Sequence, residues 1–482
     1  MEVVDRSLAG RFRHMNKLAR GGLILGGTAL GLMALRRFLN PPPRYAPWEK
    51  PRYRDFEKKV LIVGGGFAGY TAAKTLCELV RDRDDVGVLV LSRENYFTFW
   101  PIVPEVVSND VDAHNVAQPL RRALITAGAS FRRARVQRVV PERNVVVAEG
   151  DIEFPYDQLV IAVGGQPNFF GIPGVEEHAL SMRGLEDAEQ IRNRVIERFE
   201  EVSLIRGEIP ESKLTFVVIG GGATGVEVAS QIHTLVHEHL ASDYPNIDPN
   251  RVRIYLVEAL PEILPELDPA LRKAARNRLY RQRIEVLTNT LAEEVTADCV
   301  RLKGGGEISS ENVIWTAGNR PNAVIQRLGL PYDEKNGIRV DEYLRVEGHR
   351  DIWAIGDCAA IPDVRQEGKI VPPNAQAAVQ EGKTVARNVL AVLDGREDEL
   401  ERFEYKPLGQ LVELGSDFAV NEVMGVRFSG FLAALFWRLA YLVRLTSPQS
   451  KARVAADWIV SFFLRPAVTQ VRGARNNADD RT

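Results

Sequence analysis

Cysteine is scarce in this chain, and the few cysteines form no pattern. The three in the 482-residue sequence lie far apart: Cys77, Cys299 and Cys358. A sparse, odd set argues against a disulfide framework and favours a reducing compartment. No Cys-x-x-Cys pair or Cys/His cluster occurs, so we expect no metal centre. Three histidines share one predicted helix without a metalloprotease pattern, which favours a polar helix surface: His233, His237 and His239.

A large excess of one charge is also lacking. The net charge of −2 gives no reason to expect a nucleic-acid partner. The balance is uneven, however, because residues 425–475 carry eight basic residues and one acidic residue, a net charge of +7. Two apolar, aromatic stretches lie there, 428–445 and 458–464, and this combination predicts helices on an anionic membrane surface. The alternative is a domain core helix whose arginines extend to the surface. Six side chains are expected to insert shallowly: Phe431, Leu435, Trp437, Trp458, Phe462 and Phe463.

Uninterrupted apolar runs are too short to span a bilayer with ease. Arg438 and Arg444 interrupt the first C-terminal stretch. Residues 21–35 carry no charge, but these fifteen residues fall short of the ~20 that a spanning helix needs. We expect 21–35 to be an uncleaved segment that lies in the membrane or crosses it shallowly.

Glycine, by contrast, is placed in two matching loops. The first comprises Gly64, Gly65, Gly66, Phe67, Ala68 and Gly69, and follows the apolar run 59–63. The second contains Gly220, Gly222, Thr224 and Gly225, and follows the run 214–219. Each run predicts a buried strand and each loop opens a helical pattern, so that free N–H groups at the helix start can bind a pyrophosphate. Two such units predict an α/β chain that binds two dinucleotides.

The next strand of each unit ends at the place where an acid usually binds a ribose. In the second unit the strand 253–257 ends at Glu258, which would repel a 2′-phosphate and predicts NADH over NADPH. In the first unit the strand 86–91 is followed by Ser92 and Arg93 instead of an acid. A further buried strand, 158–163, runs through Ala162 and ends at Gly164.

Two later segments carry polar groups suited to a flavin or a quinone. The strand 351–355 ends at Gly356 and Asp357, and this carboxylate could bind ribityl hydroxyls. The helix after Pro372 and Pro373 carries Gln376, Ala377 and Gln380, and the two glutamines share one face at i, i+4 spacing. Amide groups there suit a quinone or flavin carbonyl, although spacing alone equally allows solvent-facing glutamines.

These motifs resemble the two-dinucleotide flavoprotein disulfide reductases, and among them the type II NADH:quinone oxidoreductases, which are non-pumping NADH dehydrogenases. The resemblance covers about residues 58–470 and rests on VLIVGGGFAGYTAAKTL, LVIAVGGQPNFFGIPGVEEHAL, FVVIGGGATGVEVASQI, NVIWTAGNRPN, DIWAIGDCAAIP, the AQAAVQEGK helix and the tail ending in ADWIVSFFLRP. It implies a membrane-associated enzyme that oxidises NADH through FAD and reduces a quinone by two electrons.

The resemblance also assigns roles to single residues. FAD would be bound by the first loop, by Ser92 and Arg93, by Ala162 and Gly164, and by Gly356, Asp357, Gln376 and Ala377. NADH would be bound by the second loop with Glu258 and Gly318. Glu227 would lie near the nicotinamide, and Gln376 and Gln380 would face the quinone. The Ser92-Arg93 pair and the Trp100–Pro104 segment depart from the commoner family wording.

Other members of the superfamily stay as alternatives. A sulfide:quinone or ferredoxin-type reductase is one, although the cysteines do not form the redox set that a disulfide or sulfide enzyme needs. A non-catalytic scaffold that keeps the fold is another, and the intact loops with Asp357 and Glu227 argue against it.

The predicted organisation is α/β, with two Rossmann-like domains and a C-terminal helical region. An extension covers 1–57, the FAD domain 58–175 and 326–395, the NADH domain 176–325, and the membrane-associating region 400–482. Expected partners are NADH, a membrane quinone and surface lipids, with a homodimer through the C-terminal region as a further hypothesis. The expected location is the membrane face exposed to NADH, most simply the cytoplasmic side of a bacterial inner membrane.

Overall fold

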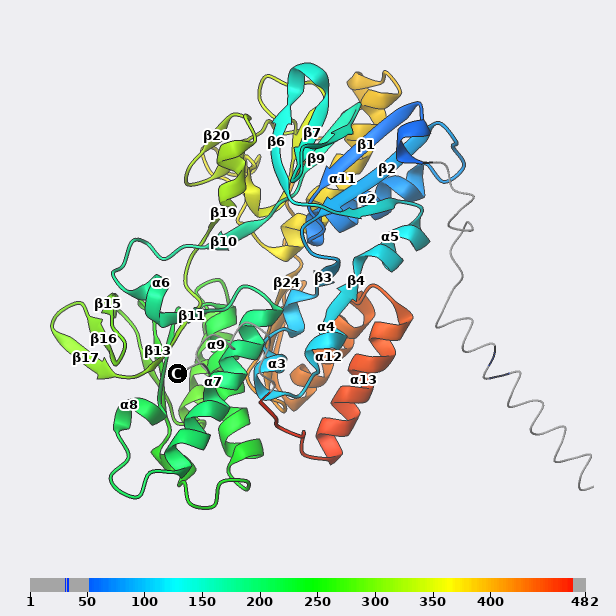
Figure 1. The fold of residues 1–482 in the computed structure, drawn as a ribbon. Helices are drawn as coiled ribbons and strands as arrows, with labels where there is room; N and C mark the ends of the chain where they lie inside the picture. The colour runs from blue at the N-terminus through cyan, green and yellow to red at the C-terminus, as the bar shows by residue number, and fades with distance from the viewer. Residues whose placement is uncertain (1–30, 32, 34–51, 471–482) are drawn as a thin grey trace, which may run out of the picture.

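The computed structural model describes residues 31, 33 and 52–470 (Figure 1). The membrane segment expected at 21–35 therefore falls almost wholly outside the described residues. No helix in the described part of the chain is long and apolar enough to cross a membrane.

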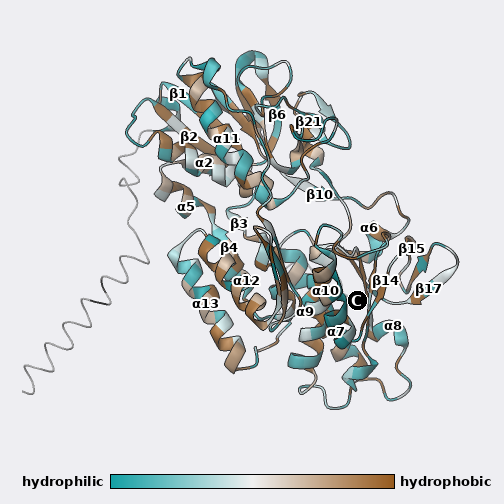
Figure 2. Ribbon diagram, turned by 180° about the vertical axis from the view of Figure 1, so that it is seen from behind, coloured by the Kyte–Doolittle hydropathy of each residue, from teal (hydrophilic) through white to brown (hydrophobic). Residues whose placement is uncertain are grey.

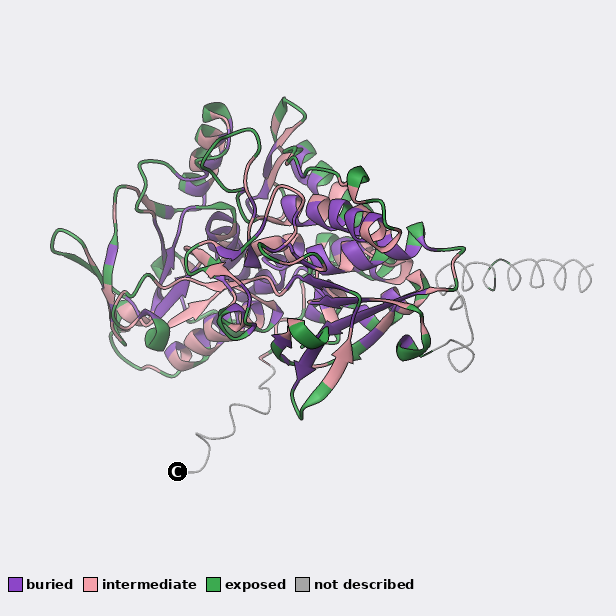
Figure 3. Ribbon diagram, turned by 90° about the horizontal axis from the view of Figure 1, so that it is seen from above, coloured by how far each residue is buried: buried purple, intermediate pink, exposed green. Residues whose placement is uncertain are grey.

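Two five-stranded parallel sheets form the centres of two α/β units. The first has the order β22 (Ile352–Ala354), β9 (Gln158–Ile161), β1 (Lys58–Val63), β2 (Val86–Ser92) and β5 (Ser130–Arg133). The second has the order β11 (Ala179–Ser181), β18 (Asn312–Trp315), β12 (Thr215–Ile219), β13 (Arg253–Val257) and β14 (Ile284–Leu287). Continuous apolar runs suit strands covered on both faces, and most of these strands are buried (Figure 3). The α/β prediction with two Rossmann-like sheets is confirmed.

Helices cover both sheets. In the first unit α2 (Phe67–Leu79) packs along α11 (Ala375–Leu393), and a side chain at Gly382 would collide with the Ala68 carbonyl. The first unit also carries α5 (Leu120–Ala127). The second unit carries α6 (Val175–His178), α7 (Leu185–Ser203), α8 (Glu211–Leu214), α9 (Ala223–Thr234) and α10 (Pro269–Arg281), and α9 continues into the π-helical turn η4 (Leu235–Leu240). Helix α3 (Glu105–Ser108) packs against α7 and α9 of the second unit, and α4 (Ala113–Val116) packs against α7 and α13 (Pro448–Phe463).

Small antiparallel sheets complete the units: β3 (Tyr96–Thr98) with β4 (Ala117–Pro119); β6 (Val136–Val140) with β7 (Val145–Ala148) and β8 (Ile152–Pro155); β15 (Ala292–Val295) with β16 (Cys299–Leu302) and β17 (Gly306–Ser309). Strands β20 (Tyr332–Asp333), β21 (Gly337–Arg339) and β23 (Ala359–Ala360) form a mixed sheet, in which β21 pairs antiparallel with β20 and parallel with β23. The two units are joined where β10 (Gly165–Pro167) pairs with β19 (Asn319–Pro321).

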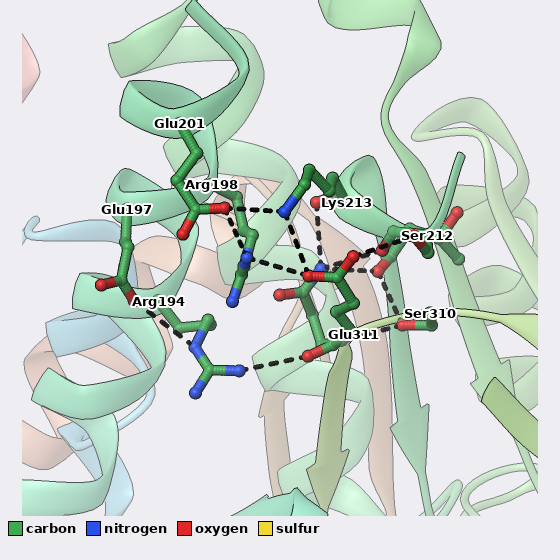
Figure 4. Close-up of polar contacts among 10 residues, drawn as sticks. Arg194, Glu197, Arg198, Glu201, Ser212, Lys213, Ser310 and Glu311 are labelled. Carbon is green, nitrogen blue, oxygen red and sulfur yellow. Dashed lines mark hydrogen bonds and ion pairs between the residues drawn. The ribbon is translucent and has the colours of Figure 1, made fainter. Parts of the chain in front are cut away.

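An ion-pair network fastens α7 to the sheet of the second unit (Figure 4). Glu311, just before β18, accepts from Arg198 at 3.0 Å and from Lys213 at 3.3 Å, and its other carboxylate oxygen accepts from Ser212. Glu201 on α7 pairs with the same Lys213 at 3.0 Å. Partly buried pairs that share partners in this way hold a helix in register better than isolated surface pairs do.

The C-terminal region is a hairpin sheet followed by two helices. Strands β24 (Gly409–Glu413), β25 (Ala419–Val423) and β26 (Val426–Gly430) pack against α12 (Phe431–Arg444), which is followed by α13 (Pro448–Phe463). Residues 428–430, which were expected to be helical, end β26 instead, because Gly430 at φ +98° turns the chain into α12. Both helices lie on the same side of the molecule and carry many hydrophobic residues (Figure 2).

Candidate active site

Steric limits explain the glycines of the first loop. Gly64 has φ +117°, and a side chain there would overlap with the Ala162 carbonyl. A side chain at Gly69 would overlap with the carbonyl of Gly64, because the helix start passes directly over the loop. At Gly66, by contrast, an added Cβ would meet nothing within 4 Å, so the backbone there is open to a ligand.

The second loop repeats this geometry almost unchanged. Gly220 has φ +116°, Gly225 lies against the Gly220 carbonyl, and Gly222 is again open. Neither α2 nor α9 has a side chain capping its N-terminus, and neither has an acid in its first turn. The leading N–H groups of both helices are therefore available to an anion. Both loops fit a dinucleotide pyrophosphate.

Glu258 lies at the end of β13, beside the second loop. Its carboxylate accepts from the Gly221 N–H at 2.5 Å and from the Leu260 N–H at 2.7 Å. These bonds fix the carboxylate where a ribose bound to this loop would lie.

Ser92 occupies the corresponding position in the first unit. The register shows the match, since Leu91 pairs with Val63 just as Val257 pairs with Ile219. The Ser92 hydroxyl lies close to the first loop, since a Cβ added at Gly65 would be 3.1 Å from Ser92 Oγ. Arg93 points outward and pairs with Glu94.

Asp357 is held at the opening of the first unit. It accepts from Asn319 Nδ2 at 2.7 Å, and burial raises the pKa of its carboxyl. Neighbouring Gly356, at φ +73°, donates its N–H to Glu381 at 2.6 Å. Burial also raises the pKa of Glu381, to about 8. Asn319 Oδ1 is buried without a partner, which suits a site that awaits a polar ligand.

Glu381 was missed by sequence reasoning, although it follows Gln380 directly. Gln376 and Gln380 do share one face, as predicted, but both side chains bind the backbone of the 406–409 segment. Gln376 donates to the Gly409 carbonyl at 2.5 Å and accepts from the Leu408 N–H at 3.1 Å. Gln380 makes the same pair of bonds with Lys406, at 2.9 and 3.1 Å. Each amide thus keeps one N–H for a ligand, and Ala377 is buried between them.

The remaining predicted residues lie around the openings of the two units. Gly164 has φ +70° and is open, and Ala162 supplies the carbonyl against Gly64. Gly318, also at φ +70°, lies against the Phe170 ring and accepts a hydrogen bond from Arg183. Thr224 lies in the first turn of α9.

Aromatic rings connect the first loop to α12. Phe67, directly after Gly66, lies 5.9 Å from the Phe99 ring, and Phe99 lies 6.1 Å from Tyr441 on α12. Tyr441 in turn packs edge-on against Trp437 at 4.8 Å. These rings form an apolar path from the C-terminal helices to the first loop.

Glu227 lies on the buried face of α9 and belongs to a group of charged residues. Its Oε1 accepts from the Glu413 N–H at 3.3 Å, and burial raises the pKa of its carboxyl to about 8. Glu413 and Glu105 lie near it, Arg438 lies beside those two, and none of the three was predicted as a site residue. They come from distant parts of the chain, so no local motif marks them. Carboxyls whose pKa is raised by burial in this way cluster at functional sites.

Comparison with known proteins decides the family. The profile of the Pyridine nucleotide-disulphide oxidoreductase family matches residues 58–382, and that of the NDH2 C-terminal domain matches residues 408–465. A type II NADH:quinone oxidoreductase of Mycobacterium tuberculosis is 30% identical, over 87% of this chain and 91% of its own length. The chain belongs to the type II NADH:quinone oxidoreductases.

Other relatives agree with this placement. A probable NADH dehydrogenase of Dictyostelium discoideum is 32% identical, over 83% of this chain and 89% of its own length. The solved structure of NDH2 from Plasmodium falciparum in complex with NADH shares the fold, with a TM-score of 0.77, 22% identity, and coverage of 86% of this chain and 100% of that one.

Neither Cys77 nor Cys358 supports the sulfide-oxidising alternative for this type II enzyme. Cys77 is buried on α2, and burial raises the pKa of the Cys358 thiol to about 12, which makes it a poor nucleophile. The sulfide:quinone oxidoreductase of Aquifex aeolicus shares the fold less closely, with a TM-score of 0.66 at 19% identity.

The C-terminal helices expose only part of the set expected to insert into a membrane. Phe431, Leu435, Phe462 and Phe463 are exposed, the last two at 67% and 76%. The prediction was wrong for both tryptophans, since Trp437 is 1% exposed and Trp458 is 7% exposed. Trp458 donates its indole N–H to Glu105 at 2.8 Å, so it anchors α13 to the protein.

The basic charge of the tail is also partly used inside the molecule. Arg438 lies near the carboxylates of Glu105 and Glu413, and Arg427 pairs with Asp268 at 2.9 Å. The interpretation of the histidines as polar surface was wrong for His239, which is buried 3.2 Å from Asp110.

Proposed function

We propose that this enzyme binds FAD on the first loop and NADH on the second, and that it reduces a quinone delivered along α12. The observation that carries this proposal is the repeated loop geometry: two uncapped helix starts, each with a fixed glycine turn and an open middle glycine. The chain oxidises NADH and reduces a quinone, as its family does.

FAD held by the first loop and Asp357 would supply the hydride acceptance from NADH and the two-electron transfer to the quinone. The residues of the chain position these partners. Glu258 would accept the ribose hydroxyls of NADH, and Asp357 with Asn319 would bind the flavin's polar chain. Glu227 would lie beside the nicotinamide, and the free N–H of Gln376 or Gln380 would bind a carbonyl oxygen. Positioning of this kind lowers the barrier because the reactants no longer have to find each other.

The exposed apolar residues of α12 and α13 would hold the enzyme on a membrane surface. Leu432, Leu439 and Val443 on α12 lie exposed with Phe462 and Phe463 on α13, and Lys451 and Arg453 supply positive charge near them. Such a patch attached to anionic lipids keeps the site beside a lipid-soluble quinone. We place the enzyme on the membrane face exposed to NADH, with residues 21–35 as a second anchor. The C-terminal region would also form the contact of a homodimer.

Absorbance spectroscopy tests the proposal directly. Purified enzyme is expected to be yellow, to bleach on addition of NADH without oxygen, and to recover its colour on addition of a quinone. Protein that stays colourless after incubation with FAD would overturn the proposal. Bleaching by NADH without recovery on addition of quinone would show that only the proposed quinone reduction is wrong.

A further inference from the structure

Three carboxylates and one guanidinium are buried together where α3, α9, β24 and α12 meet. They are Glu105, Glu227, Glu413 and Arg438. The three glutamates are between 0% and 8% exposed, which is unusual for charged residues. Only Glu227 has a role in the function proposed above.

Glu105 and Glu413 compete for the same guanidinium. Arg438 Nη2 lies 3.7 Å from Glu105 Oε1 and 3.6 Å from Glu413 Oε1. Glu105 accepts from the Trp458 indole with both oxygens, at 3.1 and 2.8 Å. Glu413 Oε2 accepts from Gln231 at 3.1 Å, whereas its Oε1 has no hydrogen bond.

The charge of this cluster depends on all the groups that face it. They are Glu105 on α3, Asp110 after α3, Glu227 and Gln231 on α9, His239 on η4, Glu413 on β24, Ser416 in the following turn, Arg438 and Tyr441 on α12, and Trp458 on α13. Asp110 has its own partners, His239 at 3.2 Å and Ser416 at 2.9 Å. The other three carboxylates have one guanidinium among them.

Full ionisation would leave two uncompensated negative charges in the interior, which is costly. The cluster therefore binds protons. Burial raises the pKa of Glu105 to about 7, against the lowering effect of Arg438. Burial, with the neighbouring charge of Glu105, raises the pKa of Glu413 well above its usual range.

The reaction itself consumes a proton. NADH, one proton and a quinone give NAD+ and a quinol, so each turnover moves two electrons and takes one proton from water. We propose that Glu105, Glu413 and Arg438 form a buried proton store behind Glu227, and that Glu413 is a positioning residue that sets how many protons the store holds. The store gives one proton toward the quinone in each turnover and regains it from water.

This inference rests on the proposed function, because Glu227 is the group through which the store would act. The backbone N–H of Glu413 already fixes the Glu227 carboxylate. Arg438 and Trp458, which hold the other two carboxylates, belong to the helices that would face the membrane.

Glu413→Gln is the informative variant, because its amide can still accept from Gln231 and can donate toward Glu105. Glu422→Gln on the neighbouring strand is the matched control, since Glu422 is part-exposed and pairs with Arg427. The first measurement is urea unfolding of the FAD-loaded enzyme at several pH values. A carboxyl whose pKa is raised by folding stabilises the protein at acidic pH, and this stabilisation falls from about pH 4.5 up to the folded pKa. Each such proton makes the unfolding constant rise about tenfold per pH unit.

In Glu413→Gln the unfolding constant should therefore rise less steeply with pH, by up to about tenfold less per pH unit. It should also remove a protonated-carboxyl band from the infrared spectrum at neutral pH. In steady-state kinetics, the alkaline limb of the kcat pH profile should move to lower pH, while KM for NADH stays unchanged. The control Glu422→Gln should match wild type in the unfolding slope, the infrared band and the kcat profile.

Other outcomes would overturn the inference. If Glu413→Gln keeps the wild-type pH profile and unfolding slope, no proton is stored at Glu413. If kcat falls equally at every pH, Glu413 is merely structural. Wild-type enzyme that does not bleach with NADH would refute the proposed function instead. Should Glu413→Gln not fold, Glu105→Gln is expected to lose the same proton, and an unchanged infrared band there also refutes the store.

Discussion

Preference for NADH over NADPH is predicted to depend on the charge of Glu258. The carboxylate is fixed by N–H groups from Gly221 and Leu260, at 2.5 and 2.7 Å, so it cannot easily move aside for a larger ligand. A ribose bound at the second loop would bring a 2′-phosphate close to this carboxylate. Glu258→Gln keeps the size of the side chain and one accepting oxygen but removes the charge.

The size of the effect follows from Coulomb's law. Two unit charges about 4 Å apart repel by roughly 1 kcal/mol in water and about 4 kcal/mol at the effective dielectric of a protein surface. Removing one charge should therefore narrow the NADH/NADPH ratio of kcat/KM by roughly 5- to 1,000-fold. Most of this change should be a higher kcat/KM for NADPH, because NADH loses only part of its hydrogen bonding to the side chain.

Steady-state rates with each donor and a soluble quinone measure this ratio. Glu262→Gln is the matched control, because Glu262 lies in the same loop but pairs with Arg276 at 3.3 Å. The control should leave the ratio unchanged. A wild-type enzyme that uses both donors equally well, or a Glu258→Gln variant with the wild-type ratio, would refute the reasoning.

Three further predictions concern other parts of the molecule. Gln380→Ala should destabilise the enzyme by roughly 1–3 kcal/mol, because it removes two hydrogen bonds to the Lys406 backbone, and should slow flavin reoxidation by quinone more than bleaching by NADH; equal slowing in stopped-flow traces would make the residue structural only. Glu311→Gln should lower the thermal midpoint without changing KM for NADH, since its ion pairs lie away from the loops; a calorimetric midpoint equal to wild type would contradict this. Replacing Phe462 and Phe463 by serine should weaken binding to anionic vesicles by roughly 1–2 kcal/mol per ring, and unchanged co-sedimentation would show that these rings stay in water.

Residues whose role is local could be predicted from the sequence. Gly64 and Gly220 directly follow buried strands, and at both positions a positive φ and close backbone contacts leave room only for glycine. Glu258 could be found for a similar reason, because the end of the next strand always lies beside that loop. Such positions depend on a few neighbouring residues, and the chain order contains all of them.

The buried cluster could not be predicted, because its members meet only after the domains have packed. Glu105, Glu413 and Arg438 are more than 300 residues apart at the extremes, and each one alone resembles a surface charge. The two tryptophans were a different case. Ala433 and Trp437 lie at i, i+4 spacing on one face of α12, and both are buried. Leu435 and Leu439 share the same spacing on another face and are exposed, so the spacing alone does not show which apolar face of α12 is buried.

The cluster also decides how membrane attachment should be tested. Deleting residues 425–482 looks like a simple test of the C-terminal anchor, yet it would remove Arg438 and Trp458 together. Glu105 and Glu413 would then remain buried without their partners, and the loss of one partner from a buried pair costs about 3–5 kcal/mol. A truncated protein would fail to bind vesicles because its interior is disrupted, whether or not the helices touch lipid. Point changes at the exposed Phe462 and Phe463 leave these interior contacts intact, so they separate attachment from folding.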